Sequence, residues 1–372
     1  MKFQTLCLLV LLLTALTACR PEATDAPDGV THARLLHIER ADSFTRVDVL
    51  DPWRAGSVLH TYILVPRRQD LPTEIPAATG KQTLLRTPLC RVVSFSSVHA
   101  SLLCDLGFQD AITGLCDTAY AFHPKLRHAL EVHSALNMGS SMAPDVERII
   151  MNTPDAVFVS PMEGSTYDAL EAAGVPLVEC ADYMESTALG RAEWMKFFGL
   201  LFDCEALTDS LFDRVCTDYD SLCTAAAAAS TRPSLLCDGK QGAAWYVPGG
   251  ASYLGQLYAD AGANYLFANR KESGSVTLSV ETVLAEGMNA DVWFVKYGAS
   301  ADITYESLAA DYAPYAQFAA WKARHIYGCN TLRVPYYEEV PFRPDLLLRD
   351  VVHILHPDVL PHHKLRYYTP LQ

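Results

Sequence analysis

Aromatic and basic side chains gather in segments that follow predicted strands of this 372-residue chain. Rings stack on the organic surface of a flat ligand, and Lys or Arg neutralises negative charge on it. This combination predicts a binding site for a large, flat, anionic chelate. The side chains that we expect to line it are Tyr120, His123, Trp245, Tyr246, Tyr297, Arg333, Tyr336 and Tyr337. Each has an ordinary alternative, because Tyr and Trp often pack in cores and single arginines are usually solvated.

A site for a bare metal ion is the competing interpretation. The histidines that would have to build it are scattered along the chain, at His99, His123, His133 and His325. No predicted helix carries a histidine pair at i and i+4, which is the spacing of helical zinc sites. His353 and His356 lie in the last turn of a predicted helix, where packing accounts for them. We therefore expect no metal site and no cofactor.

Sequence signatures of catalysis are missing from the chain. It has no G-x-S-x-G elbow, no P-loop and no G-x-G-x-x-G. Gly249-Gly250 before Ser252 suits either an anionic ligand group on backbone N–H groups or a turn before a capped helix. The sequence therefore favours binding over catalysis.

Charge and cysteine content exclude further classes of protein. The formal net charge of −14 argues against nucleic acid or anionic lipid as a partner. An odd number of cysteines follows Cys19, none of them in a C-x-x-C pair, and most lie in apolar stretches. We expect them to be buried small side chains rather than a disulfide framework or a zinc site.

The first nineteen residues have the pattern of an export signal. Lys2 precedes the apolar run Leu6–Leu13, which is too short to span a bilayer. The next small residues and Cys19 resemble the bacterial lipobox, in which the cysteine is lipidated and becomes the mature N-terminus. Residues 20–30 are typical of a flexible tether, which would hold a soluble domain at a membrane surface. An ordinary signal peptide cut near Ala18 is the alternative.

The rest of the chain divides into four parts. Residues 31–88 alternate apolar and polar side chains, as an antiparallel β-rich leader does. In residues 89–188 short apolar runs alternate with helical periodicity, which implies an N-terminal lobe of parallel βα units. Residues 189–232 contain linker helices, one of them roughly 25 residues or about 40 Å long. Residues 233–372 resume the βα alternation as a C-terminal lobe.

This order predicts the fold class. It is α/β, with two Rossmann-like lobes joined by one long α-helix and preceded by the β-rich leader. Open parallel sheets bind ligands beyond the carboxyl ends of their strands. We therefore expect a ligand cleft between the lobes.

One element occurs at comparable places in the two lobes. PDVERIIMNTPDAVFVS, residues 144–160, and SVETVLAEGMNADVWFV, residues 279–295, each place a Glu near the start of a helix that leads into a strand. These residues are Glu147 and Glu281. The repetition indicates that the lobes are structural duplicates. A negative side chain at a helix N-terminus also complements the helix dipole, which is one explanation of the placement.

Five stretches in order resemble the substrate-binding proteins of bacterial ABC importers for iron complexes and vitamin B12, whose lobes are joined by a single long helix. They are RVVSFSSVHASLLCDLG, PDVERIIMNTPDAVFVS, ALEAAGVPLVE, LSVETVLAEGMNADVWFV and RPDLLLRDVVHILHPDVLP. The leader lies outside the resemblance. In that family the Glu of each repeated element meets an arginine pocket on the permease dimer, and the resemblance assigns this docking role to Glu147 and Glu281.

The resemblance also implies a function. We expect a periplasmic protein, anchored to a membrane through Cys19, that captures a siderophore-type iron chelate and delivers it to an ABC permease dimer. Cobalamin or haem is the alternative cargo within the same class. An extracytoplasmic enzyme on two α/β lobes, or a binder of bare metal, is the alternative from another class. We expect a monomer, and only small closure of the cleft because one helix links the lobes.

Overall fold

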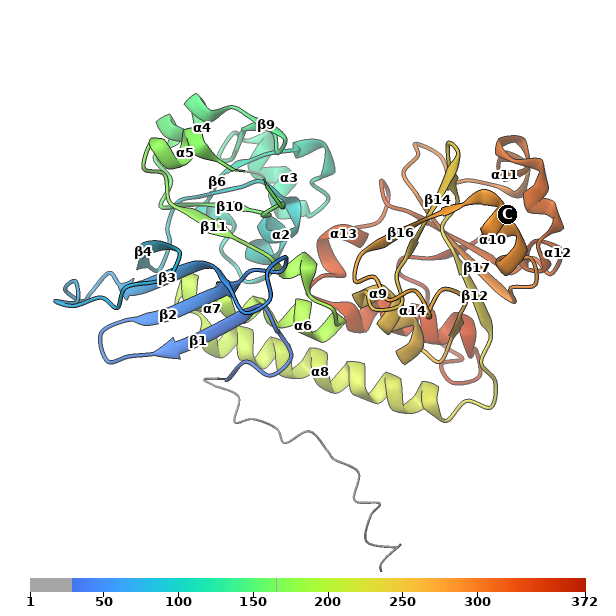
Figure 1. Cartoon of the computed structure of the whole chain (residues 1–372). Coiled ribbons are helices and arrows are strands. Elements are labelled where there is room, and N and C mark those ends of the chain that lie inside the picture. Colours follow the sequence, from blue (N-terminus) through green and yellow to red (C-terminus); the bar gives the residue numbers. More distant parts are fainter. Residues whose placement is uncertain (1–28, 165) are drawn as a thin grey trace, which may run out of the picture.

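The computed structural model describes residues 29–164 and 166–372. Within them two α/β lobes stand side by side above a long helix, α8 (Glu205–Ala227), and a β-sheet lies against the first lobe (Figure 1). The predicted fold class is therefore confirmed. The predicted signal peptide, the lipidation site Cys19 and nearly all of the predicted tether lie outside the described residues.

The β-rich leader is a four-stranded sheet of order β1-β2-β3-β4. Its strands are β1 (Leu36–Arg40), β2 (Thr45–Leu50), β3 (Val58–Pro66) and β4 (Lys81–Thr87). The first two pairs are antiparallel, as the alternating pattern predicts, whereas β3 and β4 are parallel. This parallel pairing is possible because residues 67–80 form a connection long enough to return the chain to the edge of the sheet at which β3 begins.

The leader packs on the first lobe and on the helices between the lobes. Tyr62 of β3 contacts Phe197 of α7 (Met195–Phe202), with ring centroids 5.6 Å apart. The Tyr62 hydroxyl accepts the backbone N–H of Glu179 at 2.7 Å, and His60 Nδ1 lies 3.0 Å from the Glu179 carboxylate. The leader is therefore packed against the first lobe as part of the same folded unit.

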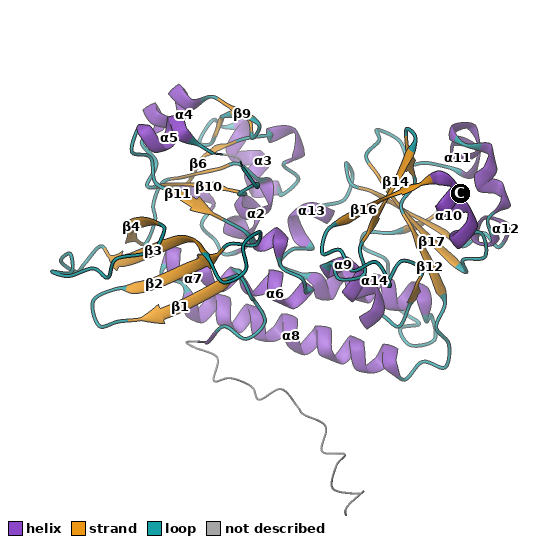
Figure 2. Ribbon diagram, in the orientation of Figure 1, coloured by secondary structure: helices purple, strands orange, loops and turns teal. Residues whose placement is uncertain are grey.

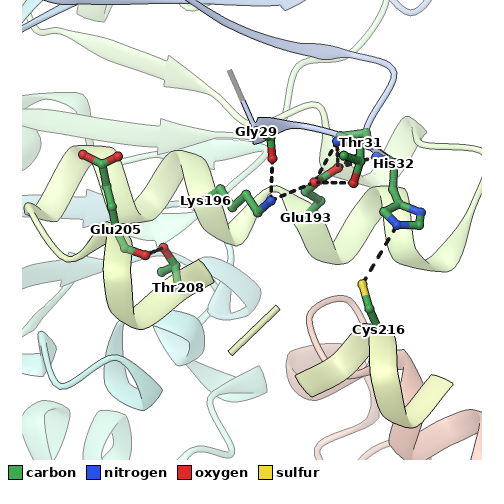
Figure 3. Close-up of polar contacts among 9 residues, drawn as sticks. Gly29, Thr31, His32, Glu193, Lys196, Glu205, Thr208 and Cys216 are labelled. Carbon is green, nitrogen blue, oxygen red and sulfur yellow. Dashed lines mark hydrogen bonds and ion pairs between the residues drawn. The ribbon is translucent and has the colours of Figure 1, made fainter. Parts of the chain in front are cut away.

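Two buried carboxylates hold the chain just before β1. Glu193, at the end of α6 (Ala188–Glu193), is 0% exposed and accepts the backbone N–H groups of Thr31–Ala33 at 2.6 to 3.0 Å (Figure 3). Lys196 Nζ approaches the same carboxylate at 3.1 Å. Glu185 accepts the next two backbone N–H groups, those of Arg34 and Leu35, at 2.9 to 3.0 Å. The entry of the chain is thus fixed on α6.

The first lobe is built around a parallel sheet of order β11-β10-β5-β6-β7. The strands are β5 (Val92–Ser94), β6 (Ile112–Leu115), β7 (Leu136–Asn137), β10 (Ala156–Val159) and β11 (Leu177–Glu179). The helices are α2 (Ser97–Asp105), α3 (Pro124–Glu131), α4 (Val146–Asn152) and α5 (Asp168–Ala172). The inner strands are buried on both faces, which explains their continuous apolar runs.

The second lobe repeats this plan with a sheet of order β15-β12-β17-β18-β19 (Figure 2). The strands are β12 (Ser234–Cys237), β15 (Asn264–Tyr265), β17 (Val292–Tyr297), β18 (Ile326–Asn330) and the antiparallel β19 (Thr369–Pro370). The helices are α9 (Tyr253–Asp260), α10 (Val280–Gly287), α11 (Tyr305–Asp311), α12 (Ala319–Lys322), α13 (Tyr336–Glu339) and α14 (Pro344–Leu355). An antiparallel sheet of β13 (Lys240–Gln241), β14 (Ala244–Pro248) and β16 (Ser275–Ser279) lies beside them.

α8 links the lobes in one unbroken run of 23 residues, about 34 Å long at the helical rise. Phe212, Val215, Tyr219 and Leu222 form its buried stripe. α7 and α14 pack along it, one from each side of the molecule. Leu207, one turn before Leu211, lies outside this stripe and is 44% exposed. The rings and aliphatic side chains of α8 belong to a continuous core that reaches both lobes and the leader.

Candidate functional site

Two adjoining hollows of about 620 and 630 Å³ lie between the lobes. They share Tyr183, Thr331 and Tyr337 in their walls, so we treat them as one interlobe cleft. The hollow on the first lobe is walled by residues that follow β5, β6 and β10, and the other by residues at the ends of β12, β17 and β18. The cleft therefore lies beyond the carboxyl ends of the strands of both lobes, as expected for open parallel sheets.

Tyrosines dominate the lining of the interlobe cleft. They are Tyr120, Tyr167, Tyr183, Tyr246, Tyr253, Tyr297 and Tyr337. The three tyrosines of the described chain that are most exposed, Tyr120, Tyr246 and Tyr337, all belong to this set. Elsewhere tyrosines pack in the core, so the solvent-facing rings are concentrated here. Each ring offers an apolar face for stacking and a hydroxyl for hydrogen bonding.

The basic residues of the cleft are paired with carboxylates. Lys296 lies 2.8 Å from Asp238. Burial alone would lower the pKa of Lys296, but Asp238 outweighs burial and holds that pKa above its ordinary value. Arg191 Nε lies 3.0 Å from Asp182 and its guanidinium stacks over the Tyr253 ring at 5.2 Å. Both cations are therefore largely neutralised before a ligand arrives.

Two acids line the hollow on the first lobe. Asp117, whose backbone is left-handed at φ 50°, accepts the backbone N–H of Ser141 at 3.1 Å and its hydroxyl at 2.5 Å. Glu338, 4% exposed, extends from α13 of the second lobe and accepts the backbone N–H of Phe122 at 2.9 Å. Burial raises the pKa of Glu338, and the Phe122 N–H opposes that rise. Among the described residues, no Lys, Arg or His lines this hollow.

The structure places four of the eight predicted ligand residues in the cleft. Tyr120 lies on the first lobe, and Tyr246 and Tyr297 lie on the second. Tyr337 belongs to α13, which packs against α2 of the first lobe, and its ring borders both hollows. Tyr297 is held by a hydrogen bond from the backbone N–H of Ile303 at 3.3 Å.

The other four predicted residues have structural surroundings outside the cleft. Trp245 is 0% exposed, packs on Trp293 and donates its indole N–H to the Cys237 carbonyl at 2.9 Å. Tyr336 is 1% exposed in the core. His123 caps α3, and Arg333 pairs with an aspartate at 3.1 Å on the surface. Trp245 and Tyr246 are neighbours on β14, so their side chains point to opposite faces and only one reaches the cleft.

Several lining residues were not singled out from the sequence. Tyr183 follows β11 in a short 3-10 helix, and Tyr253 is the first residue of α9. Arg191 of α6 both binds Asp182 and lines the cleft. A search for aromatic residues at every helix start after a strand would have found Tyr253. Nothing in the sequence distinguished Glu338 from other surface acids.

Glu147 and Glu281 lie in the first turns of α4 and α10, one on each lobe. Both helices lie on the side of the molecule away from α8 in this view (Figure 1). Both side chains are exposed, and neither forms an ion pair within residues 29–164 and 166–372. The helix N-caps are made by other residues, Asp145 and Ser279, so capping does not require either glutamate.

A family model described as periplasmic binding protein matches residues 92–331, more than half of the chain. The chain therefore belongs to the periplasmic binding protein family. Its relatives include two uncharacterized lipoproteins of Methanocaldococcus jannaschii. MJ0878 is 24% identical over 296 residues, which cover 77% of this chain and 69% of that protein. MJ0872 is 25% identical over 338 residues, which cover 86% of this chain and 82% of that protein.

Solved structures share the fold at low sequence identity. The molybdate-binding protein MolA of Haemophilus influenzae has a TM-score of 0.60 at 16% identity, and the match covers 76% of this chain and 90% of MolA. The TroA-like periplasmic binding protein FepB of Veillonella parvula has a TM-score of 0.58 at 11% identity, and the match covers 77% of this chain and 96% of FepB. An ABC-type Fe3+-hydroxamate transport protein of Saccharomonospora viridis has a TM-score of 0.53 at 18% identity, and the match covers 68% of this chain and 92% of that protein. The resemblance inferred from the sequence is confirmed at the level of fold and family.

The described residues contain no helix that is both long and apolar enough to span a bilayer. They also contain no group of three or more His, Cys, Asp or Glu side chains with the arrangement of a metal site. The interlobe cleft is the main candidate site because it gathers tyrosines and paired charges from both lobes.

Proposed function

We propose that this protein captures a metal chelate, of the siderophore-iron type, in its interlobe cleft and delivers it to the permease dimer of an ABC importer. The observation that carries the proposal is the concentration of solvent-facing tyrosine rings from both lobes around one cleft. A chelate presents a large organic surface around its metal, and rings from two sides bind such a surface by stacking. Hollows of 620 and 630 Å³ are in the range of small-molecule sites.

A corrinoid or haem is the second candidate cargo. The tyrosine-rich lining favours it, because a macrocycle has broad flat faces that aromatic rings can cover. Family membership and fold support either cargo equally. Only bound-ligand chemistry separates them.

The proposal includes a membrane anchor and a docking surface. A lipid on Cys19 would hold the protein in the periplasm at the membrane that carries the permease, and the lipoprotein names of both relatives support this placement. Glu147 and Glu281 are proposed to pair with arginines on the two copies of the permease subunit. Their exposure at corresponding places on two similar lobes supports this role. One protein molecule, acting as a monomer, would then engage both halves of the permease.

Equilibrium dialysis of the soluble domain against coloured chelates tests the proposal. The panel contains ferric hydroxamate, ferric catecholate, ferric citrate, haem and cyanocobalamin, with bare zinc, bare manganese and molybdate as controls. Tight saturable binding of one chelate supports the proposal and names the cargo. Binding of bare metal or molybdate alone, or of nothing in the panel, overturns it.

Substitution at Tyr337 tests the cleft itself. Tyr337 borders both hollows, so removal of its ring in Tyr337→Ala is expected to weaken chelate binding about tenfold, which corresponds to loss of one aromatic contact. Tyr337→Phe is the matched control, because it keeps the ring and should bind within a few-fold of the unmodified protein. Equal binding by all three proteins would place the cargo elsewhere.

A further inference from the structure

Glu338 has an unusual position in the interlobe cleft. It extends from α13, which belongs to the second lobe but packs against α2 of the first. Its Oε1 accepts the backbone N–H of Phe122 at 2.9 Å, a bond between residues 216 positions apart in the chain. Its side chain also lines the hollow on the first lobe. The Glu338 side chain therefore connects the lobes and forms part of the wall of the space where cargo would bind.

The second oxygen of this carboxylate has no hydrogen-bond partner within the described chain. The Ser101 hydroxyl acts as a nearby donor that lowers the pKa of Glu338, although Ser101 Oγ has no partner within ordinary hydrogen-bond distance. A buried carboxylate is costly where its hydrogen bonds are incomplete, and Ser101 compensates Glu338 only in part. A ligand group that donates a hydrogen bond would remove that cost.

The other charged side chains of the cleft also disfavour an anionic ligand. The hollow on the first lobe is lined by two acids, Asp117 and Glu338, and by no base within residues 29–164 and 166–372. In the other hollow Lys296 is paired with Asp238 and Arg191 with Asp182. An anionic ligand would meet the carboxylates without finding an unpaired cation, and like charges at close range are repelled.

We infer that the cargo carries no net negative charge and places hydrogen-bond donors, amide N–H or ammonium groups, against the two acids that line this hollow, Asp117 and Glu338. This inference rests on the proposed function and narrows its ligand class to neutral or cationic chelates. It departs from the anionic chelate expected from the sequence. The reason is that the bases visible in the sequence are neutralised by acids that are distant in the chain, such as Asp238 for Lys296.

Two matched series of chelates test the charge. The first is ferrioxamine B, which is cationic through its free ammonium, with its N-acetyl derivative, which is neutral, and its N-succinyl derivative, which is anionic. The second is cyanocobalamin, which is neutral and rich in amide N–H groups, with the monocarboxylate made by hydrolysis of one peripheral amide. In the series that binds, we expect the anionic member to bind at least about tenfold more weakly than its neutral or cationic parent. Tighter binding of the anionic member overturns the inference.

Substitution of Glu338 tests the contact. Glu338→Gln keeps the shape of the side chain and removes its charge, so binding of the parent chelate should weaken about tenfold or more, the effect of losing one charge-assisted hydrogen bond. Glu131→Gln, on the exposed surface of α3, is the matched control and should bind normally. Thermal unfolding confirms that each variant is folded. Unchanged or improved binding by folded Glu338→Gln overturns the inference.

The outcomes separate this inference from the proposed function. If no chelate of either series or of the wider panel binds, the proposed function fails and the inference falls with it. If chelates bind but the anionic ones bind best, the proposed function stands and only the inferred charge is wrong.

Discussion

At the scale of single residues, Asp182 organises the floor of the interlobe cleft. It is 1% exposed, and its two oxygens lie 2.9 Å from His99 Nε2 and 3.0 Å from Arg191 Nε. Burial alone would raise the pKa of Asp182, but His99 and Arg191 outweigh burial and hold that pKa below its ordinary value. The carboxylate thereby joins α2, the segment after β11, and α6.

Replacement of this carboxylate should be strongly destabilising. Asp182→Asn leaves Arg191 buried beside a neutral amide, and breaking one side of a buried ion pair costs about 3 kcal/mol or more of unfolding free energy. Urea denaturation measures the loss. Asp209→Asn on the exposed face of α8 is the control and should change stability by less than about 0.5 kcal/mol. A loss below about 1 kcal/mol for Asp182→Asn would show that Asp182 does not hold the floor together.

At the scale of elements, a buried acid of α6 and an exposed acid of α8 both contribute to the attachment of the leader, beside the buried Glu185 already described. Glu193 of α6 is buried against the backbone of Thr31–Ala33, whereas Glu205 in the first turn of α8 forms an exposed ion pair with Arg40 (Figure 3 shows both glutamates). Exposed ion pairs contribute little, but a buried carboxylate with several N–H donors contributes much more. The attachment therefore depends mainly on Glu193.

The contribution of Glu193 should depend on pH. Burial alone would raise its pKa, but the backbone N–H groups of Thr31–Ala33 outweigh burial and the pKa lies below the ordinary value of 4.5. Its stabilising effect is therefore complete above about pH 4.5 and disappears as pH falls through the lowered pKa. Glu193→Gln should lower the melting temperature by several degrees at pH 7, with a difference from the unmodified protein that shrinks below pH 4.5.

Glu205→Gln is the matched control for this experiment. It should change the melting temperature by about a degree or less, because its ion pair with Arg40 is exposed. Glu185 binds the same segment, but its contribution to stability depends on pH in the opposite sense. Burial raises its pKa, so its ionised form is disfavoured in the folded state. A Glu193→Gln difference that is constant between pH 7 and pH 3 would contradict the assignment.

The elements themselves were largely predictable from the sequence. Buried parallel strands such as β10 and β17 are continuous apolar runs, and helices α9 and α14 have clear periodicity, so the alternation of the two lobes was visible. β14 was missed because Gly and Pro flank it and its partners are distant in the chain. Because β14 is a strand, successive side chains point to opposite faces, so Trp245 is buried while the adjacent Tyr246 faces the cleft.

The candidate site was predictable only in part. Residues directly after strands were found, as Tyr297 after β17 illustrates. Tertiary packing decides which of two adjacent aromatic side chains is buried. Tyr336 is buried in the core, whereas Tyr337 is exposed in the cleft. The pairing of Lys296 with Asp238 joins positions 58 residues apart, so sequence reasoning could not anticipate that the cleft bases are neutralised.

At the scale of the whole molecule, the repeated glutamates predict a two-point attachment to the permease. Glu147→Arg and Glu281→Arg together should lower chelate uptake by cells more than tenfold, because both proposed charge pairs with the permease would become repulsive. Chelate binding by the isolated protein should not change, since both residues lie outside the interlobe cleft.

The control for docking is another exposed glutamate in the first turn of a helix. Glu306 of α11 has this placement, so Glu306→Arg perturbs a helix dipole in the same manner without touching the repeated element. Its uptake should equal that of the unmodified protein. If Glu306→Arg lowers uptake as much as the repeated glutamates do, their role is structural rather than docking.

The unbroken α8 has a further consequence for the transport cycle. Because a single helix links the lobes, we expect the opening of the cleft to change little, so that cargo binds without a slow closure of the lobes. The loaded and empty proteins then present almost the same outline. On the proposed function, a permease that favours the loaded form would have to recognise the cargo itself at the opening of the cleft, because the lobes change little between the two forms.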